Sequence, residues 1–198
     1  MVKKTFLALA ALLASLPAFS KYDAEKGAYT HSVYADYGAS SIFSIFNPDL
    51  SYYPYDDISN QRYTGVFNLG YEYRLGRRFG IGADISWGGK TYTMTGYDEI
   101  TKKVLYVEDH RETILSIMVT FRWIWLDREL VSLYSAGKLG YSHCTYDKIE
   151  TMMEWRSFLP YFHVVPIGIE LGRGHVRGFA ELGLGAQACV AGGIKYRF

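Results

Sequence analysis

The chain has 198 residues, of which 17% are aromatic and 20 are glycine, and its 21 Lys and Arg residues nearly balance its 20 Asp and Glu residues. This near-neutral charge argues against nucleic-acid binding, which needs a concentrated basic surface. Only two cysteines are present, so a disulfide-stabilised scaffold is excluded, and the length suits a single domain.

The N-terminal segment, residues 1–20, has the three parts of a secretory signal peptide. Lys3 and Lys4 precede an apolar run over residues 6–16, and small residues lead to a cleavage site expected after Ser20. A transmembrane anchor is the alternative, but the run is short for a bilayer core of about 30 Å. Cleavage would remove Lys3 and Lys4 from the 21 basic residues, leaving 19 against 20 acidic ones.

Apolar residues alternate with polar or small ones through most of residues 21–198, which we expect to form a single β-barrel domain. In the segment 62–75, Phe67 and Leu69 share one face while Asn68 and Glu72 share the other. A tight turn then leads into the next alternating segment, as in a hairpin. Eight strands are expected, at residues 28–38, 62–75, 79–88, 112–125, 130–146, 158–171, 176–185 and 188–198.

Longer polar segments at 39–61, 95–109 and 147–157 alternate with short turns in the connections, and only the last connection departs from this order by being short. Outer-membrane barrels place short turns in the periplasm and longer loops outside. The sequence therefore predicts an all-β fold, an eight-stranded antiparallel up-and-down transmembrane β-barrel with short periplasmic turns and longer extracellular loops.

Alternation alone does not say which face of a strand lines the interior. A soluble, lipocalin-like barrel that carries a lipophilic ligand is therefore the rival architecture. The aromatic ends of the apolar faces, as at Trp123 and Trp125, favour the membrane, as do the asymmetric connections and the terminal Phe198.

In the membrane orientation, the lumen would contain acidic and basic side chains in similar numbers. Eight strands leave interior room only for side chains, and buried charges persist only when paired. A plugged, salt-bridged lumen is therefore expected, with a narrow gated channel as the alternative. Lys195 and Arg197 are expected to pair with Glu181 and Asp36. The expected lumen residues are Asp36, Glu72, Arg74, Asp84, Arg122, Lys138, Glu170, Arg177, Glu181, Lys195 and Arg197.

Pro166 lies inside the sixth expected strand and has no backbone N–H to donate, so a β-bulge is expected there. Simple alternation along this strand would direct Tyr161 and Val165 outward. It would direct Phe162, Val164 and Pro166 into the lumen.

No catalytic residue, cofactor site or metal site is predicted, because the histidines lack metal-ligand spacing; they are His31, His110, His143, His163 and His175. His143 paired with Ser86 or Ser116 across strands is the arrangement considered for an outer-leaflet lipid-modifying enzyme. Cys144 and Cys189 are expected to face the lumen three strands apart, too far for a disulfide.

The final strand carries Gly193, Tyr196 and Phe198 at the glycine, hydrophobic and aromatic positions of the targeting strand of outer-membrane barrels, with Ala191 in the usual polar position. Further matching stretches are 67–78, 166–172 and 178–183. With the signal peptide, these stretches resemble small bacterial outer-membrane β-barrel proteins of the OmpA/OmpX-like class.

The resemblance implies location in the bacterial outer membrane, surrounding lipid, and contact with periplasmic chaperones and the barrel assembly machinery during insertion. It implies that Gly193, Tyr196 and Phe198 form the assembly signal and that the protein is a monomer. It brings no catalytic residue, cofactor or nucleic-acid partner. The expected function is structural, or an interaction with an extracellular partner through the loops; a lipid-modifying enzyme and a narrow channel are the alternatives.

Overall fold

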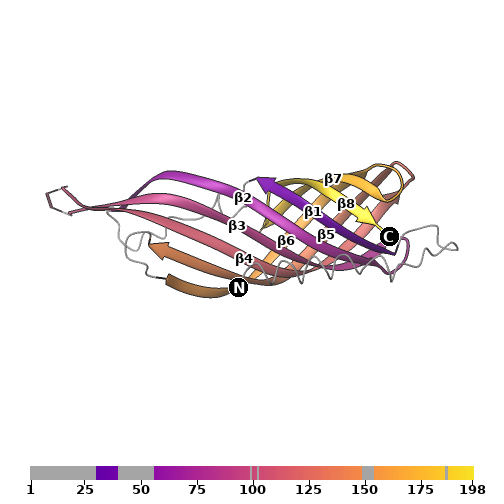
Figure 1. Ribbon diagram of the computed structural model, residues 1–198, viewed down its shortest axis with the longest axis horizontal. Helices are drawn as coiled ribbons and strands as arrows, with labels where there is room; N and C mark the ends of the chain where they lie inside the picture. The colour runs from indigo at the N-terminus through magenta and orange to yellow at the C-terminus, as the bar shows by residue number, and fades with distance from the viewer. Residues whose placement is uncertain (1–29, 40–55, 99, 102, 149–153, 186) are drawn as a thin grey trace.

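The computed structural model describes residues 30–39, 56–98, 100–101, 103–148, 154–185 and 187–198. Within these ranges the chain forms a closed antiparallel barrel in which each strand pairs with its neighbours in sequence and β1 pairs with β8 (Figure 1). The strands are β1 (His31–Ala39), β2 (Asp56–Arg74), β3 (Phe79–Tyr97), β4 (Val104–Asp127), β5 (Val131–Lys148), β6 (Glu154–Leu171), β7 (Val176–Gly185) and β8 (Val190–Arg197). The predicted eight-stranded barrel is confirmed.

The two faces of the wall differ in chemistry. In β7, for example, Arg177, Phe179 and Glu181 are buried while the residues between them are exposed. The exposed faces of the other strands carry large apolar residues, including Ile117, and the buried faces carry charges. Because the charges are inside and the apolar residues outside, the lipocalin-like alternative is wrong and the outer surface suits lipid.

An apolar band with aromatic ends surrounds the barrel. On β3 the exposed face runs from Phe79 through Ile85 to Trp87. These eight steps span about 26 Å along a strand, or about 20 Å along the axis of a barrel whose strands tilt by about 40°. This height is close to the roughly 25 Å apolar band of outer-membrane barrels. In the part of the chain that the structure covers, no helix is long and apolar enough to cross a membrane.

The central strands continue well past this band. Pairing between β1 and β2 ends at Gly38 and Val66, whereas β2 and β3 remain paired as far as Asp56 and Gly96. Figure 1 shows β2, β3 and β4 extending beyond the end of β1. Most of the loop expected at 95–109 is therefore strand. Both ends of the loop expected at 147–157 are also strand, and so are residues 39 and 56–61 of the loop expected at 39–61.

These extensions could not be predicted from the sequence pattern. Outside the apolar band both faces of a strand meet water, so apolar residues no longer alternate with polar ones although strand pairing continues. Cross-strand polar contacts replace it: Lys90 Nζ lies 3.0 Å from Glu112 Oε2, and Thr93 Oγ1 donates to Asp109 over 2.8 Å. The expected signal peptide, and the parts of the expected loops at 40–55 and 149–153, lie outside the described residues.

The bulge predicted at Pro166 is present, because the register of β6 shifts there against both β5 and β7. The extra residue reverses the alternation before it, so Tyr161 and Val165 are buried while Phe162 and Val164 are exposed. The assignment of these four side chains from simple alternation was wrong, as was the inward assignment of Pro166, which is exposed. A bulge adds one residue to one strand only, which moves each preceding side chain to the other face.

Neither cysteine forms a disulfide, as expected. Cys144 is buried in β5, whereas Cys189 lies one residue before β8 rather than within it.

Candidate functional site

The interior of the barrel is the candidate site, and each strand contributes at least one ionisable side chain to it. The charged residues expected in the lumen all face inward and are at most 7% exposed. In strand order they are Asp36; Glu72 and Arg74; Asp84; Arg122; Lys138; Glu170; Arg177 and Glu181; and Lys195 and Arg197.

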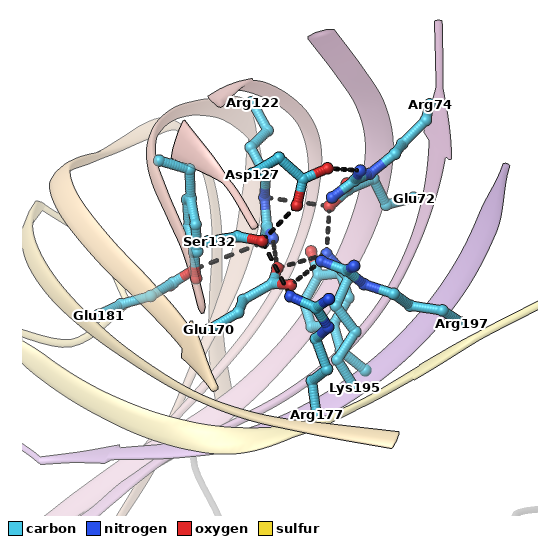
Figure 2. Close-up of polar contacts among 12 residues, drawn as sticks. Glu72, Arg74, Arg122, Asp127, Ser132, Glu170, Arg177, Glu181, Lys195 and Arg197 are labelled. Carbon is cyan, nitrogen blue, oxygen red and sulfur yellow. Dashed lines mark hydrogen bonds and ion pairs between the residues drawn. The ribbon is translucent and has the colours of Figure 1, made fainter. Parts of the chain in front are cut away.

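Glu170 on β6 is the centre of the first cluster (Figure 2). Its Oε1 accepts hydrogen bonds from Arg122 over 2.5 Å and from Lys195 over 2.9 Å, and its Oε2 accepts one from Arg197. Glu72 on β2 completes the cluster, with its Oε2 2.9 Å from Lys195 Nζ and 3.0 Å from Arg122 Nε. Two carboxylates therefore hold three cations from β4 and β8 across the full width of the lumen.

Asp84 on β3 is the centre of a second cluster. Lys138 Nζ lies 3.1 Å from its Oδ2, Thr120 donates to the same oxygen over 2.5 Å, and Tyr34 donates to its Oδ1. Lys138 also donates to Gln187 Oε1 over 2.7 Å. This cluster joins β1, β3, β4 and β5 to the residues that precede β8.

A third cluster lies where β4 and β5 approach their short connection (Figure 2). Arg74 donates to Asp127 Oδ2 over 2.8 Å, and Ser132 donates to Asp127 Oδ1 over 2.5 Å. Arg177 donates to Ser132 over 2.9 Å and to the Glu129 carbonyl over 3.0 Å. These bonds tie the turn between β4 and β5 to the inner wall.

Two tyrosine rings enclose the guanidinium of Arg122, whose carbon lies 3.9 Å from the ring centre of Tyr134 and 5.8 Å from that of Tyr34. Tyr134 also donates to Glu181 Oε1 over 2.7 Å. The rings have room because glycines face them: a Cβ on Gly168 would lie 2.3 Å from Tyr134 Cζ. Cation–π contact and ion pairing therefore act on the same buried cation.

The pairing expected for the last strand was wrong. Lys195 and Arg197 contact Glu72 on β2 and Glu170 on β6, each one strand beyond a neighbour of β8, instead of the expected Glu181 and Asp36. Lys195 lies opposite Tyr34 on β1 and Arg177 on β7, neither of which can accept its charge, and its side chain is long enough to cross.

Asp36 instead accepts a 2.5 Å hydrogen bond from the Asn68 amide, its direct cross-strand neighbour. Its Oδ2 and the Asn68 Oδ1 are both buried acceptors that have no hydrogen-bond donor among the described residues. The cluster around Glu170 also contains buried atoms without a hydrogen-bond partner among the described residues, at Glu72 Oε1, Arg122 Nε and Arg197 Nε.

Sequence reasoning missed Asp127, which it placed in a turn. The register between β4 and β5 shifts between Ile124 and Leu126, and this bulge brings the Asp127 carboxylate to Arg74. With Asp127, which is exposed at the turn end of the lumen, added to the five expected acids, six acids and six bases take part in the network among the described residues. Tyr34, Tyr134 and Gln187 were also missed as members of the network, because hydroxyl and amide groups give no charge pattern in a sequence.

The residues of the expected assembly signal lie at the seam where the barrel closes. The backbones of Phe198 and His31 exchange two hydrogen bonds, of 2.8 and 2.9 Å, and their rings stack with centroids 5.8 Å apart. Tyr196 stacks on Phe198 at 5.9 Å. A Cβ on Gly193 would lie 2.2 Å from the Ala35 carbonyl, so this position on β8 requires glycine for close strand contact.

The serine and histidine pairs considered for lipid chemistry do not form. Ser86 and Ser116 are buried in the lumen, and Ser116 lies 2.6 Å from Ser142 between their hydroxyl oxygens. His143 is adjacent to the buried Ser142 and therefore points to the other face of β5. The described residues also include no group of three His, Cys, Asp or Glu side chains arranged to hold a metal ion.

The fold and the ion-paired lumen define a small transmembrane β-barrel of the outer-membrane type. Residues 6–198 match the family described as outer membrane protein beta-barrel domain, and the chain belongs to this family. Family membership places the protein in the bacterial outer membrane. No curated protein matches the sequence.

Solved structures with a similar barrel share little sequence. The N-terminal β-barrel domain of Pseudomonas aeruginosa OprF matches with a TM-score of 0.48 and 11% identity, covering 86% of this chain and 99% of that one. Ail, the attachment invasion locus protein of Yersinia pestis, in complex with the heparin analogue sucrose octasulfate, matches with a TM-score of 0.46 and 14% identity over 86% and 99% of the two chains. A second Ail structure gives a TM-score of 0.42, with 14% identity and the same coverage.

Proposed function

We propose that this protein is a non-conducting outer-membrane barrel that anchors an extended β-sheet at the cell surface. The observation that carries the first half of the proposal is the lumen network, in which six acids and six bases from all eight strands are paired or packed across the interior. Its role is structural, combined with interaction through the strands that continue beyond the apolar band.

The energetics of the ion pairs support a closed lumen. Opening a path along the axis would separate Arg122 from Glu170 and Lys195 from both of its carboxylates. Removing one partner from a buried pair costs on the order of 3–5 kcal/mol, and a conducting path would break several pairs at once. Tyr34 and Tyr134 fill the same level of the lumen.

The strands that continue beyond the apolar band, β2 to β6, would all end on the outer side of the membrane. The short turns at 75–78, 128–130 and 172–175 would lie in the periplasm with the C-terminus, and the extended ends of β2 to β6 would lie outside. At the far end of the β3–β4 hairpin, Ile100 is 90% exposed, and Val104, Leu105 and Val107 are also exposed. An apolar tip of this kind supports a role in contact with an extracellular partner.

Conductance of the purified barrel in a planar lipid bilayer tests the closed lumen. We expect no steady single-channel steps from the wild type. A variant in which Arg122 and Tyr134 are both replaced by alanine removes a buried cation and the ring that packs on it, and provides the control for an opened lumen. Steady steps from the wild type would overturn the non-conducting assignment in favour of the narrow channel.

Labelling of single cysteines in intact cells tests the orientation. Cys144 and Cys189 are first replaced by alanine, and one cysteine is then introduced at Thr101, near the hairpin tip, or at Arg77, in a short turn; both positions are exposed. A membrane-impermeant maleimide should label the Thr101→Cys variant in intact cells and the Arg77→Cys variant only after lysis. The reverse result would place the short turns outside.

A further inference from the structure

A pocket of about 320 Å³ opens on the outer surface of the barrel near the short-turn end, lined by Arg78, Trp123, Ile124 and Trp125. Three of its four lining residues, Arg78, Trp123 and Trp125, are exposed, whereas Ile124 is buried and packs with Tyr134 inside the barrel. We propose that this pocket binds the phosphate group of one phospholipid in the periplasmic leaflet. The choice of leaflet rests on the orientation proposed above.

The hollow follows from the strand lengths and from a bulge. Pairing of β3 with β4 begins at Phe79 and Trp123, whereas β4 continues to Asp127. The last residues of β4 therefore have no strand beside them on the β3 side. The register shift around Trp125 adds a residue to β4 against β5, which changes the direction of the side chains at this level.

The turn that carries Arg78 is held against this overhang. Ile124 N donates to the Arg78 carbonyl over 2.8 Å, and Leu75 N donates to the Phe79 carbonyl over 2.9 Å. The rings of Phe79 and Trp123 lie 5.6 Å apart. The guanidinium of Arg78 is therefore attached to a fixed backbone beside two indole rings that are 55% and 53% exposed, those of Trp123 and Trp125.

The charge of Arg78 has no carboxylate partner within the described ranges. The two acids of the neighbouring turn are already used: Asp127 contacts Arg74, and Glu129 contacts Arg173 over 2.5 Å. An anion is therefore the complement that the described residues do not supply to Arg78. Arginine suits phosphate because its planar group can donate two parallel hydrogen bonds, and indole N–H groups are further donors.

The position of the pocket selects a lipid as the source of the phosphate. Trp123 and Trp125 lie at the aromatic end of the apolar band, the height at which phospholipid headgroups meet the hydrocarbon core. Phe121 continues the exposed apolar face of β4 below them and would contact the acyl chains. A free phosphate ion would use the guanidinium but not this apolar wall.

The experiment compares the full chain, folded in a neutral detergent, with the variants Arg78→Gln and Arg77→Gln. Arg77 lies in the same turn and is also exposed, but it does not line the pocket, so it is the matched control for lost surface charge. Native mass spectrometry counts bound phosphatidylglycerol during titration, with diacylglycerol as the lipid that lacks phosphate. Glycerol phosphate, which lacks acyl chains, is added as a competitor.

We expect one phosphatidylglycerol bound to the wild type and to Arg77→Gln, and about tenfold weaker binding to Arg78→Gln because a charge-assisted bidentate contact is lost. Diacylglycerol should not bind at the same concentration, and an equal concentration of glycerol phosphate should not displace the lipid. The proposal is overturned if Arg78→Gln binds as the wild type does, if Arg77→Gln is equally impaired, or if diacylglycerol binds equally well. Displacement by glycerol phosphate would overturn the lipid as the source.

Because lipid binding is measured in detergent, its result does not depend on which way the barrel faces in cells. The cysteine-labelling experiment can therefore reject the orientation while the pocket is confirmed, and the titration can reject the pocket while the orientation is confirmed. Folding of each variant is checked by the mobility difference between unheated and heated samples in gel electrophoresis.

Discussion

Replacing Glu170 with glutamine keeps the size of the side chain but removes the negative charge that Arg122, Lys195 and Arg197 share. Only the carboxylate of Glu72 would then remain in the first cluster, against three cations. Lys195 and Arg122 keep their contacts with Glu72, whereas Arg197 has no second carboxylate within salt-bridge distance among the described residues.

The expected loss in free energy of unfolding is about 3–5 kcal/mol, the range for removing one partner from a buried ion pair. The matched control is Glu129→Gln, since Glu129 pairs with Arg173 at the surface, where the two side chains are 67% and 75% exposed. This change should cost less than about 1 kcal/mol because water screens an exposed pair. Adding Arg197→Gln to Glu170→Gln should recover part of the loss, because it removes the cation left without a partner.

The measurement is urea unfolding of the barrel refolded into lipid vesicles, followed by tryptophan fluorescence and by gel mobility. Coincident curves from the two probes would establish that unfolding is two-state. If Glu170→Gln falls within about 1 kcal/mol of the wild type, the first cluster does not carry the stability assigned to it, and water or rearranged partners must compensate.

Three further changes test separate parts of the fold. Gly168→Ala should destabilise the barrel by about 1–3 kcal/mol, because its Cβ would lie 2.3 Å from the fully buried Tyr134 ring, whereas Gly137→Ala, with nothing within 4 Å of its Cβ, should be neutral in the same urea assay. Tyr134→Phe keeps the ring but leaves Glu181 without its 2.7 Å donor, and should cost about 1–3 kcal/mol by urea unfolding; no change would show that Glu181 is satisfied elsewhere. Deletion of Phe198 should lower the amount of protein in the outer membrane far more than it lowers the stability of barrel refolded in vitro, and normal outer-membrane levels would contradict its role as an assembly signal.

The alternation of side chains was sufficient to predict the number of strands and which faces are charged. In β2, for example, Asn68 and Glu72 are buried and Phe67 and Tyr73 are exposed, as the period of two indicates. The signal is strong within the apolar band because the two faces meet media of very different polarity. Beyond the band this contrast is lost, and strands such as β4 run much further than their apolar pattern.

Bulges were the second source of error in predicting which side chains face the lumen. Predicting that a bulge is present does not by itself predict how it redirects the neighbouring side chains. The missing N–H of Pro166 predicted a bulge at that position. The reversed alternation of Tyr161 and Val165 became clear only from the strand register. The bulge at Trp125 contains no proline or glycine from which it could be predicted. For this reason Asp127 was assigned to a turn. Both errors change which side chains reach the lumen.

The amino-acid sequence alone predicts strands with charges on one face and apolar residues on the other, because alternation is a local property of extended chain. Which charges meet across the lumen depends on the three-dimensional arrangement of the strands. Lys195 joins Glu72 and Glu170, which lie 123 and 25 residues away along the chain, because the strand register and the closure of β1 onto β8 bring β2 and β6 within reach of β8. No pattern along a single strand contains that information, since partners across a lumen are set by the geometry of the whole barrel.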